Sequence, residues 1–236
     1  MIGNYGGNTL YFENTGSASS AAFATAQTNP FGLSDVGQYV VPTFADLDGD
    51  GDLDALIGEG YGNTLYFENT GSASSAAFAT AQTNPFGLSD VGFSAAPTLA
   101  DLDADGDLDA LIGNSDGNTL YFENTGSASS AAFATAQANP FGLSNVGSLA
   151  KPTFADLDGD GDLDALIGEW YGQTLYFENT GSATSAAFAT AQINPFGLSD
   201  VGQSAAPTLA DLDGDGDLDA LVGNSGNFSI SHGSLG

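Results

Sequence analysis

The sequence predicts an all-β protein, a β-propeller built from four 55-residue blades of four strands each. Three observations predict this fold. An acidic motif begins at Asp46, Asp101, Asp156 and Asp211, a spacing of 55 residues each time. Each unit contains short β-type segments separated by turns rich in Gly, Asn and Ser, and no segment has a convincing helical period. A repeat of this length indicates a solenoid, a propeller or an array, and four strands per unit favour the propeller.

The four strands of a blade are expected at fixed places around each acidic motif. The first, "QYVVPTFA", leads into the motif, and the second, "LDALIG", leaves it. The third is "TLYFEN", entered through a Gly-Asn turn, and the fourth and weakest follows the small-residue turn "TGSASS". In the unit around Asp46 these strands are expected over residues 38–45, 53–58, 64–69 and 76–82.

The two ends of the chain are expected to complete one another. The chain starts near the end of a second strand and continues into a third and fourth, whereas residues 218–224 end a segment that supplies a first and second. These N- and C-terminal half-blades would form one blade, close the ring and hide two sheet edges. The alternative is two chains forming one eight-bladed ring, and the mass in solution would distinguish the two. Residues 1–224 then form a single propeller domain, and residues 225–236 form a degenerate C-terminal tail.

Charge and composition exclude several partners and kinds of site. The chain carries 30 acidic residues against a single cation, Lys151, for a net charge of −29. Such a surface repels nucleic acids and anionic membranes, so neither is expected as a partner. The chain has no cysteine, which excludes disulfides and cysteine-bound zinc, and no apolar run long enough to insert into a membrane.

The acidic residues are clustered along the sequence: 20 of the 30 lie in the four motif copies. In the copy from Asp46 to Asp54, side chains one, three, five and nine can point inward, the seventh residue can offer its carbonyl, and Gly51 permits the turn. Without a cation, neighbouring carboxylates about 4 Å apart would repel one another by about 4 kcal/mol per pair at an effective dielectric constant of about 20. A solvated acidic turn would explain one copy but not four in register. An EF-hand is excluded because Ile57 stands at its twelfth position.

All-oxygen ligation with several carboxylates favours Ca²⁺ over Mg²⁺, with about one ion per repeat and four per chain. Ala104 replaces glycine in the second copy, so the fourth position does not require glycine. The predicted metal-site residues are Asp46, Asp48, Asp50, Asp52, Asp54, Asp101, Asp103, Asp105, Asp107, Asp109, Asp156, Asp158, Asp160, Asp162, Asp164, Asp211, Asp213, Asp215, Asp217 and Asp219.

The order of these motifs resembles a known family. Phe31-Gly32 and its equivalents, a strand, an Asp-x-Asp-x-Asp-Gly-x-x-Asp loop and then "ALIGE" are similar to the FG-GAP or VCBS-type repeat of integrin α-subunit propellers, bacterial surface proteins and a fungal lectin. The resemblance covers residues 1–224. It implies that Asp46, Asp48, Asp50, Asp54 and the carbonyl of Asp52 bind calcium. The family commonly closes seven blades, whereas this chain carries four.

Differences between the copies fall in two places, the connection between strands two and three and the start of strand one. In an up-and-down blade both places lie on the face opposite the metal loops, so a ligand is expected there. Neutral drift of duplicated loops would give the same pattern. The candidate ligand-binding residues are Tyr39, Glu59, Tyr61, Phe93, Lys151, Glu169, Trp170 and Tyr171.

The function expected is that of a calcium-stabilised extracellular or cell-surface propeller, a binding, adhesion or structural repeat module with a glycan or protein ligand. The alternative is a lectin that uses the variable face or pockets between blades. An enzyme is not expected, because the single histidine, His232, lies in the tail and no Cys or Arg is present. Near-identical copies and the start at Met1 within a repeat indicate an engineered or excised fragment whose signal sequence lies outside it. The chain is expected to be a monomer or a homodimer.

Overall fold

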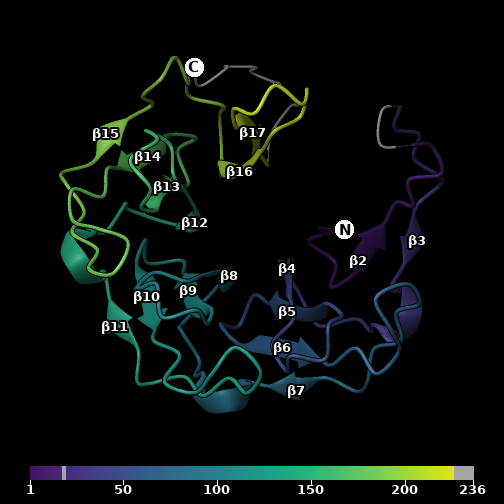
Figure 1. The fold of residues 1–236 in the computed structure, drawn as a ribbon. Coiled ribbons are helices and arrows are strands. Elements are labelled where there is room, and N and C mark those ends of the chain that lie inside the picture. Colours follow the sequence, from purple (N-terminus) through teal and green to yellow (C-terminus); the bar gives the residue numbers. More distant parts are fainter. Residues whose placement is uncertain (18–19, 226–236) are drawn as a thin grey trace.

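The computed structural model describes residues 1–17 and 20–225, and its antiparallel sheets follow one another in chain order around a ring (Figure 1). Three sheets have the four strands expected of a blade, in the order of the chain. Their strands are β4 (Val41–Ala45), β5 (Asp54–Gly58), β6 (Thr64–Phe67) and β7 (Gln82–Thr83); β8 (Ala96–Ala100), β9 (Asp109–Gly113), β10 (Thr119–Phe122) and β11 (Gln137–Ala138); and β12 (Lys151–Ala155), β13 (Asp164–Gly168), β14 (Thr174–Phe177) and β15 (Gln192–Ile193).

The remaining sheets lie at the two ends of the ring. The first contains β1 (Ile2–Gly3), β2 (Thr9–Tyr11) and β3 (Gln27–Thr28), and the last contains β16 (Ala206–Ala210) and β17 (Asp219–Gly223). The helical elements of the described residues are three 3-10 turns, η1 (Pro30–Gly32), η2 (Pro85–Gly87) and η3 (Pro140–Gly142). No helix within residues 1–17 and 20–225 is long and apolar enough to cross a membrane.

The core lies between consecutive blades. The second strand of each complete blade, "DALIG", is buried at all five positions, because both of its faces pack against other strands. Leu56 and Tyr66 of one blade pack against Ala110, Ile112 and Phe122 of the next. The blades approach so closely at the ends of these strands that a Cβ on Gly58 would lie 2.2 Å from the carbonyl oxygen of Ala95. Close packing between consecutive blades therefore holds this strand in place.

Two strand predictions need correction. The first strand of the second sheet begins at Val41 rather than at residue 38, because Tyr39 adopts a left-handed conformation with φ 55° that interrupts the extended backbone. The fourth strand was expected over residues 76–82, but β7 covers Gln82–Thr83. The Asn69 side chain explains the difference, since its Oδ1 accepts from the backbone N–H groups of Gly71 and Ala77, and this local turn replaces ladder pairing.

The predicted pairing of the terminal half-blades is not among the strand pairs of the described residues. In a complete blade, Ile57 and Gly58 pair with Leu65 and Thr64. In the first sheet, Ile2 and Gly3 hold the matching places opposite Leu10 and Thr9. The edge of β2 that would receive Val222 and Gly223 is therefore already occupied, and β17 pairs with β16 alone among the described strands. Residues 226–236 of the predicted tail lie outside the described residues.

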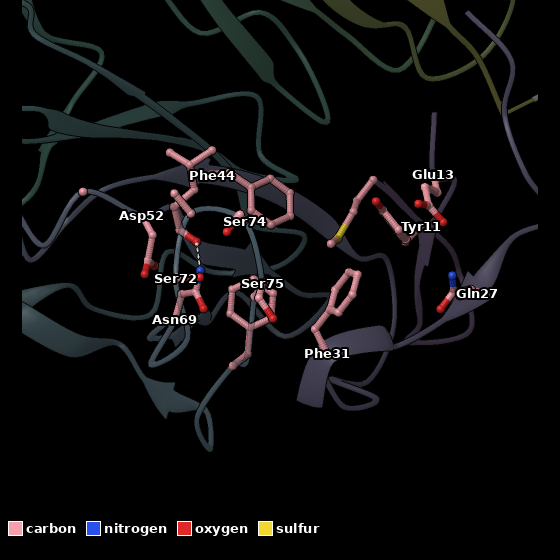
Figure 2. Close-up of a pocket in the computed structure, with 16 residues that line it drawn as sticks. Tyr11, Glu13, Gln27, Phe31, Phe44, Asp52, Asn69, Ser72, Ser74 and Ser75 are labelled. Carbon is pink, nitrogen blue, oxygen red and sulfur yellow. Dashed lines mark hydrogen bonds between the residues drawn. The ribbon is translucent and has the colours of Figure 1, made fainter. Parts of the chain in front are cut away.

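The incomplete first sheet leaves a cavity of about 640 Å³ beside the second sheet (Figure 2). Figure 2 shows Tyr11 and Phe31 on one side of it and Asp52 and Asn69 on the other. Met1 stands where the complete blades have a buried leucine, and it is 39% exposed whereas Leu56 is 1% exposed. The cavity therefore lies where β1 has two residues and the equivalent strand β5 has five, and we do not interpret it as a binding site.

We expect the same substitution to have different effects at equivalent positions of β9 and β17. Leu111 is fully buried, so Leu111→Ala should lower the free energy of unfolding by about 2–5 kcal/mol. Leu221 is 44% exposed, so Leu221→Ala should lower it by about 1 kcal/mol. Urea unfolding measures both. An equally large effect at Leu221 would show that a further strand, from the same chain or from a second copy, covers β17 in solution.

Candidate metal centre

Four acidic loops connect the first and second strands of the successive sheets. In the second sheet the loop leaves β4 after Ala45 and returns at Asp54, and these two residues are themselves paired across the two strands. The antiparallel pair therefore holds the two ends of the loop together. Equivalent pairs join Ala100 to Asp109, Ala155 to Asp164 and Ala210 to Asp219.

The first aspartate organises each loop around itself. Asp46 accepts two hydrogen bonds, at 2.7 Å from the Gly49 N–H to Oδ1 and at 3.0 Å from the Gly51 N–H to Oδ2. Both glycines have positive φ, 77° and 94°, so the chain turns sharply back toward this carboxylate. The Asp50 N–H donates to Asp48 Oδ1 at 3.2 Å, which continues the turn. Hydrogen bonds to its own carboxylates therefore hold the loop in a curled conformation.

The second loop shows that glycine is not required at the fourth position, as the sequence predicts. Ala104 adopts the left-handed conformation there, with φ 57°. The bond to the sixth residue is kept, because the Gly106 N–H donates to Asp101 Oδ2 at 3.1 Å. Asp101 Oδ1 is buried without a hydrogen-bond partner among the described residues. A buried carboxylate oxygen in that state is a free ligand atom.

The side chains that the sequence selects as inward-pointing converge in the structure. In each loop, three carboxylates offer oxygen atoms that all lie within 4.8 Å of one another. The first, third and fifth positions cluster in two loops, and the first, third and ninth cluster in the other two. The groups are Asp46, Asp48 and Asp50; Asp101, Asp103 and Asp105; Asp156, Asp158 and Asp164; and Asp211, Asp213 and Asp219. Each of the four predicted positions therefore takes part in at least two of the clusters, and each cluster contains three of the four.

The seventh aspartate lies outside these clusters. The side chains of Asp52, Asp107 and Asp162 are buried, and each has an Oδ1 without a hydrogen-bond partner among the described residues. The expected contribution of this residue is its carbonyl rather than its carboxylate, and that expectation stays a prediction.

The ninth aspartate anchors the loop, and in two of the four loops, as Asp164 and Asp219, it also belongs to the carboxylate cluster. Asp54 is 1% exposed and accepts hydrogen bonds from the Leu47 N–H at 3.1 Å, the Tyr66 hydroxyl at 2.9 Å and the Asn69 N–H at 2.7 Å. Asp109 and Asp164 have the equivalent three donors. This carboxylate therefore ties the acidic loop to the third strand and to the turn that follows it.

Sequence reasoning missed the tyrosine and asparagine that hold this anchor. The tyrosines are Tyr66, Tyr121 and Tyr176, and the asparagines are Asn69, Asn124 and Asn179. Their signal was available, because "LYFEN" keeps one hydroxyl and one amide at fixed distances after each acidic motif. These polar groups in a buried strand need a partner, and the ninth carboxylate provides it.

Burial disfavours the charged form of the seventh and ninth aspartates of these loops. Burial raises the pKa of Asp109 to about 6, although the hydrogen bonds from Asn124, Leu102 and Tyr121 lower it. Burial likewise raises the pKa of Asp52, and the neighbouring charge of Asp50 adds to this effect. These shifts disfavour the charged carboxylates, and a bound cation would reverse them. The converging carboxylates, with the orphaned Oδ1 of the cluster member Asp101, fit a hard metal ion.

The predicted ligand-binding residues fall into three groups on the other face of the ring. Tyr39, Lys151 and Trp170 line one cavity. The rings of Tyr61, Phe93 and Tyr171 are 62%, 64% and 70% exposed. Glu59 and Glu169 are buried, and their carboxylates accept from the amides of their own loops, such as Tyr61 N–H and Tyr171 N–H at 2.8 Å. The two glutamates therefore shape the loops that carry the other residues.

Comparisons with known proteins agree with this geometry. The sequence model of the FG-GAP-like repeat family matches residues 46–112, 101–167 and 156–222, which together cover the greater part of the chain. No curated protein matches significantly. Among solved structures, a chain of the Photorhabdus luminescens Tc holotoxin pore is similar over 96% of this chain, with 13% sequence identity and a TM-score of 0.42. The present chain spans 13% of the length of that protein, and so distant a likeness adds nothing to the fold assignment.

Proposed function

Because this chain belongs to the FG-GAP-like repeat family, we propose that it is a calcium-stabilised extracellular β-propeller that acts as a binding or adhesion module. The observation that carries the proposal is the set of four acidic loops, in each of which three carboxylates converge within 4.8 Å. Without a cation, repulsion between the carboxylates would oppose their convergence in all four loops.

Calcium is the cation that the donor set favours. The residues that would hold it in the second sheet are Asp46, Asp48, Asp50 and Asp54, with the carbonyl of Asp52. These donors are all oxygens and several are carboxylates, which suits Ca²⁺ better than Mg²⁺, because Mg²⁺ demands stricter octahedral geometry and keeps more of its waters. The bound ion would supply the positive charge that lets four carboxylates stay ionised close together. Asp54, through Tyr66 and Asn69, would transmit this stabilisation to the third strand.

The extracellular assignment rests on the chemistry of the sites and on the family. Calcium is present at millimolar concentration outside cells, where weak sites of this kind are filled. The net charge of −29 would be reduced by eight on binding four ions, which eases the mutual repulsion of the blades. The proposal assigns no catalytic role to the chain.

A lectin is the second candidate function, and one observation favours it. Tyr39 and Trp170 line a single cavity on the face opposite the acidic loops, and Tyr5 packs edge-on against Tyr39 with ring centroids 4.7 Å apart. Aromatic rings of this kind present flat apolar surfaces for a sugar. A glycan array tests this function, and absence of binding to any sugar would remove the lectin but leave the calcium-stabilised module.

Calorimetric titration with calcium tests the primary proposal. We expect four ions per chain, with magnesium competing weakly. The variant Asp48→Asn/Asp103→Asn/Asp158→Asn should lose the three corresponding sites, because each change removes a converging carboxylate.

The matched control is Asp35→Asn/Asp90→Asn/Asp200→Asn, which removes the same charge outside the loops. Asn145 already stands at the equivalent position of another repeat, where it accepts from the Gly147 N–H as Asp35 accepts from Gly37. The control should keep four ions. Equal calcium uptake by the two variants would contradict the proposed sites.

A further inference from the structure

A cavity of about 500 Å³ lies at the centre of the ring, on the face opposite the acidic loops. The first residues of the innermost strands line it, among them Val41 of β4, Ala96 of β8 and Lys151 of β12. Each of these strands ends at an acidic loop, so the cavity and the candidate metal sites are separated by the length of the strand. The volume falls in the range of small-molecule sites.

The two most unusual residues of the sequence meet in this cavity. Lys151 is the single Lys or Arg of the chain, and Trp170 is its single tryptophan. Lys151 is paired with Gly168 across β12 and β13, and Trp170 follows two residues later, so both belong to the same end of one sheet. The other repeats carry Val41, Ala96 and Ala206 at the position of Lys151. Two departures from a near-identical repeat therefore fall side by side.

Lys151 is a largely buried cation that has no anionic partner within residues 1–17 and 20–225. Its Nζ donates a hydrogen bond to Ser204 Oγ at 2.8 Å. No Asp or Glu is among the described residues that line the cavity, although the chain carries 30 of them. Burial lowers the pKa of Lys151, and no neighbouring charge offsets that effect. An ammonium group has three donors, so an anion in the cavity would supply the missing partner.

The backbone holds the wall around Lys151 in place. The Ser204 N–H donates to the Trp170 carbonyl at 2.7 Å, and the Trp170 N–H donates to the Ser148 carbonyl at 2.9 Å. Ser204 is therefore bonded both to the Lys151 ammonium and to the backbone of Trp170. This arrangement holds the Lys151 ammonium close to the backbone of Trp170 before a ligand arrives.

Four equivalent positions around the cavity adopt a conformation that favours glycine, yet none of them is glycine. They are Tyr39, Ser94, Leu149 and Ser204, with φ of 55°, 59°, 53° and 61°. All four line the cavity. Side chains other than Gly, Asn and Asp are uncommon in this region, and such positions concentrate at ligand sites. These four positions therefore carry varied side chains in a backbone conformation that glycine would adopt without strain.

We propose that this axial cavity binds a small monocarboxylate that carries a ring, with the carboxylate on the Lys151 ammonium and the ring against Trp170 and Tyr39. The inference rests on the proposed binding function and names its ligand class. One cation with a serine hydroxyl beside it matches one negative charge. A phosphate dianion would bring a second charge into a molecule of net charge −29 with no further cation to meet it. The aromatic rings of Trp170 and Tyr39 favour a ligand with a flat apolar ring.

Trp170 makes the binding directly observable, because its fluorescence is the only tryptophan signal of the chain. The calcium-loaded protein is titrated with benzoate and with D-glucuronate, which separate an aromatic acid from an acidic sugar. Their neutral counterparts, benzyl alcohol and D-glucose, and inorganic phosphate are titrated in parallel. We expect a saturable change with at least one carboxylate, about tenfold or more tighter than with its neutral counterpart or with phosphate.

Lys151→Ala is the decisive variant. Alanine already stands at the equivalent positions of two other repeats, Ala96 and Ala206, so the variant should fold. Its melting temperature should be unchanged or higher, because the substitution removes a buried cation that lacks an anionic partner. Carboxylate affinity should fall about tenfold or more. Ile193→Ala is the control: it trims an exposed apolar side chain on the outer strand β15, outside the cavity, where Ala138 of β11 stands at the equivalent position, and it should keep the affinity.

Carboxylate binding that is equally tight in Lys151→Ala and in the unaltered chain would overturn the inference. So would a neutral counterpart that binds as well as its acid, or no response to either acid by a protein shown by calorimetry to hold four calcium ions. In each of these cases calcium uptake persists, so the primary proposal stands. Failure to take up calcium would instead overturn the proposed function on which the ligand class rests.

Discussion

Removal of calcium is expected to lower the midpoint of thermal unfolding by about 20 °C or more. A site filled at one hundred times its dissociation constant stabilises the folded chain by about 2.7 kcal/mol, so four sites together contribute about 10 kcal/mol. For a chain of this size, each 1 kcal/mol shifts the midpoint by about 2–4 °C. The effect is large because each ion replaces carboxylate repulsion with attraction in a loop whose ends lie on two core strands.

The control for this melt separates calcium binding from simple screening. Sodium chloride at the ionic strength of the calcium buffer screens the net charge of −29 but does not occupy the loops. We therefore expect calcium to raise the midpoint far more than sodium chloride does, and EGTA to reverse the rise. A melt that is the same in calcium and in EGTA would exclude a structural role for the acidic loops.

The second large effect is expected at the buried ninth aspartate. Asp109→Ala should lower the free energy of unfolding by about 3–5 kcal/mol even in EGTA, because it leaves buried donors without an acceptor. These donors are the Leu102 N–H, the Tyr121 hydroxyl and the Asn124 N–H, all within 3.2 Å of the carboxylate in the folded chain. Urea unfolding with and without calcium measures the loss.

Asp103→Ala is the matched variant in the same loop. Asp103 belongs to the carboxylate cluster, but the hydrogen bond that it accepts comes from the Asp105 N–H of its own turn, at 3.3 Å. Its loss should destabilise the chain in calcium and have little effect in EGTA. If Asp109→Ala were also harmless in EGTA, the ninth aspartate would be a ligand alone and not an anchor between the loop and the third strand.

Local signals in the sequence were sufficient to predict the second and third strands of each blade. "DALIG" and "TLYF" form strands where the repeat predicts them, because their apolar side chains lie between blades and their ends are set by glycine and asparagine turns. The outer strand could not be read in the same way. Its residues have weak β propensity, and the Asn69 side chain takes up the amides of Gly71 and Ala77 that a longer ladder would use.

Sequence reasoning also separated the metal loops from the variable face, but it could not assign roles within that face. Glu59 and Tyr39 looked alike as variable, surface-directed residues. The structure buries Glu59 beneath its own loop and places Tyr39 on the wall of the axial cavity. The difference depends on contacts between segments that no local pattern records.

The sequence by itself determined the repeat, the order of strands and the residues of each acidic loop, because these depend on neighbours a few positions apart. The tertiary structure decided what depends on distant segments. It set Ile2 and Gly3 on the edge of β2 that β17 would otherwise share, and it left Leu221 half exposed. It also brought Lys151, Trp170 and Ser204 together across two sheets, because packing the innermost strands around one axis makes neighbours of residues that lie 53 positions apart in the chain.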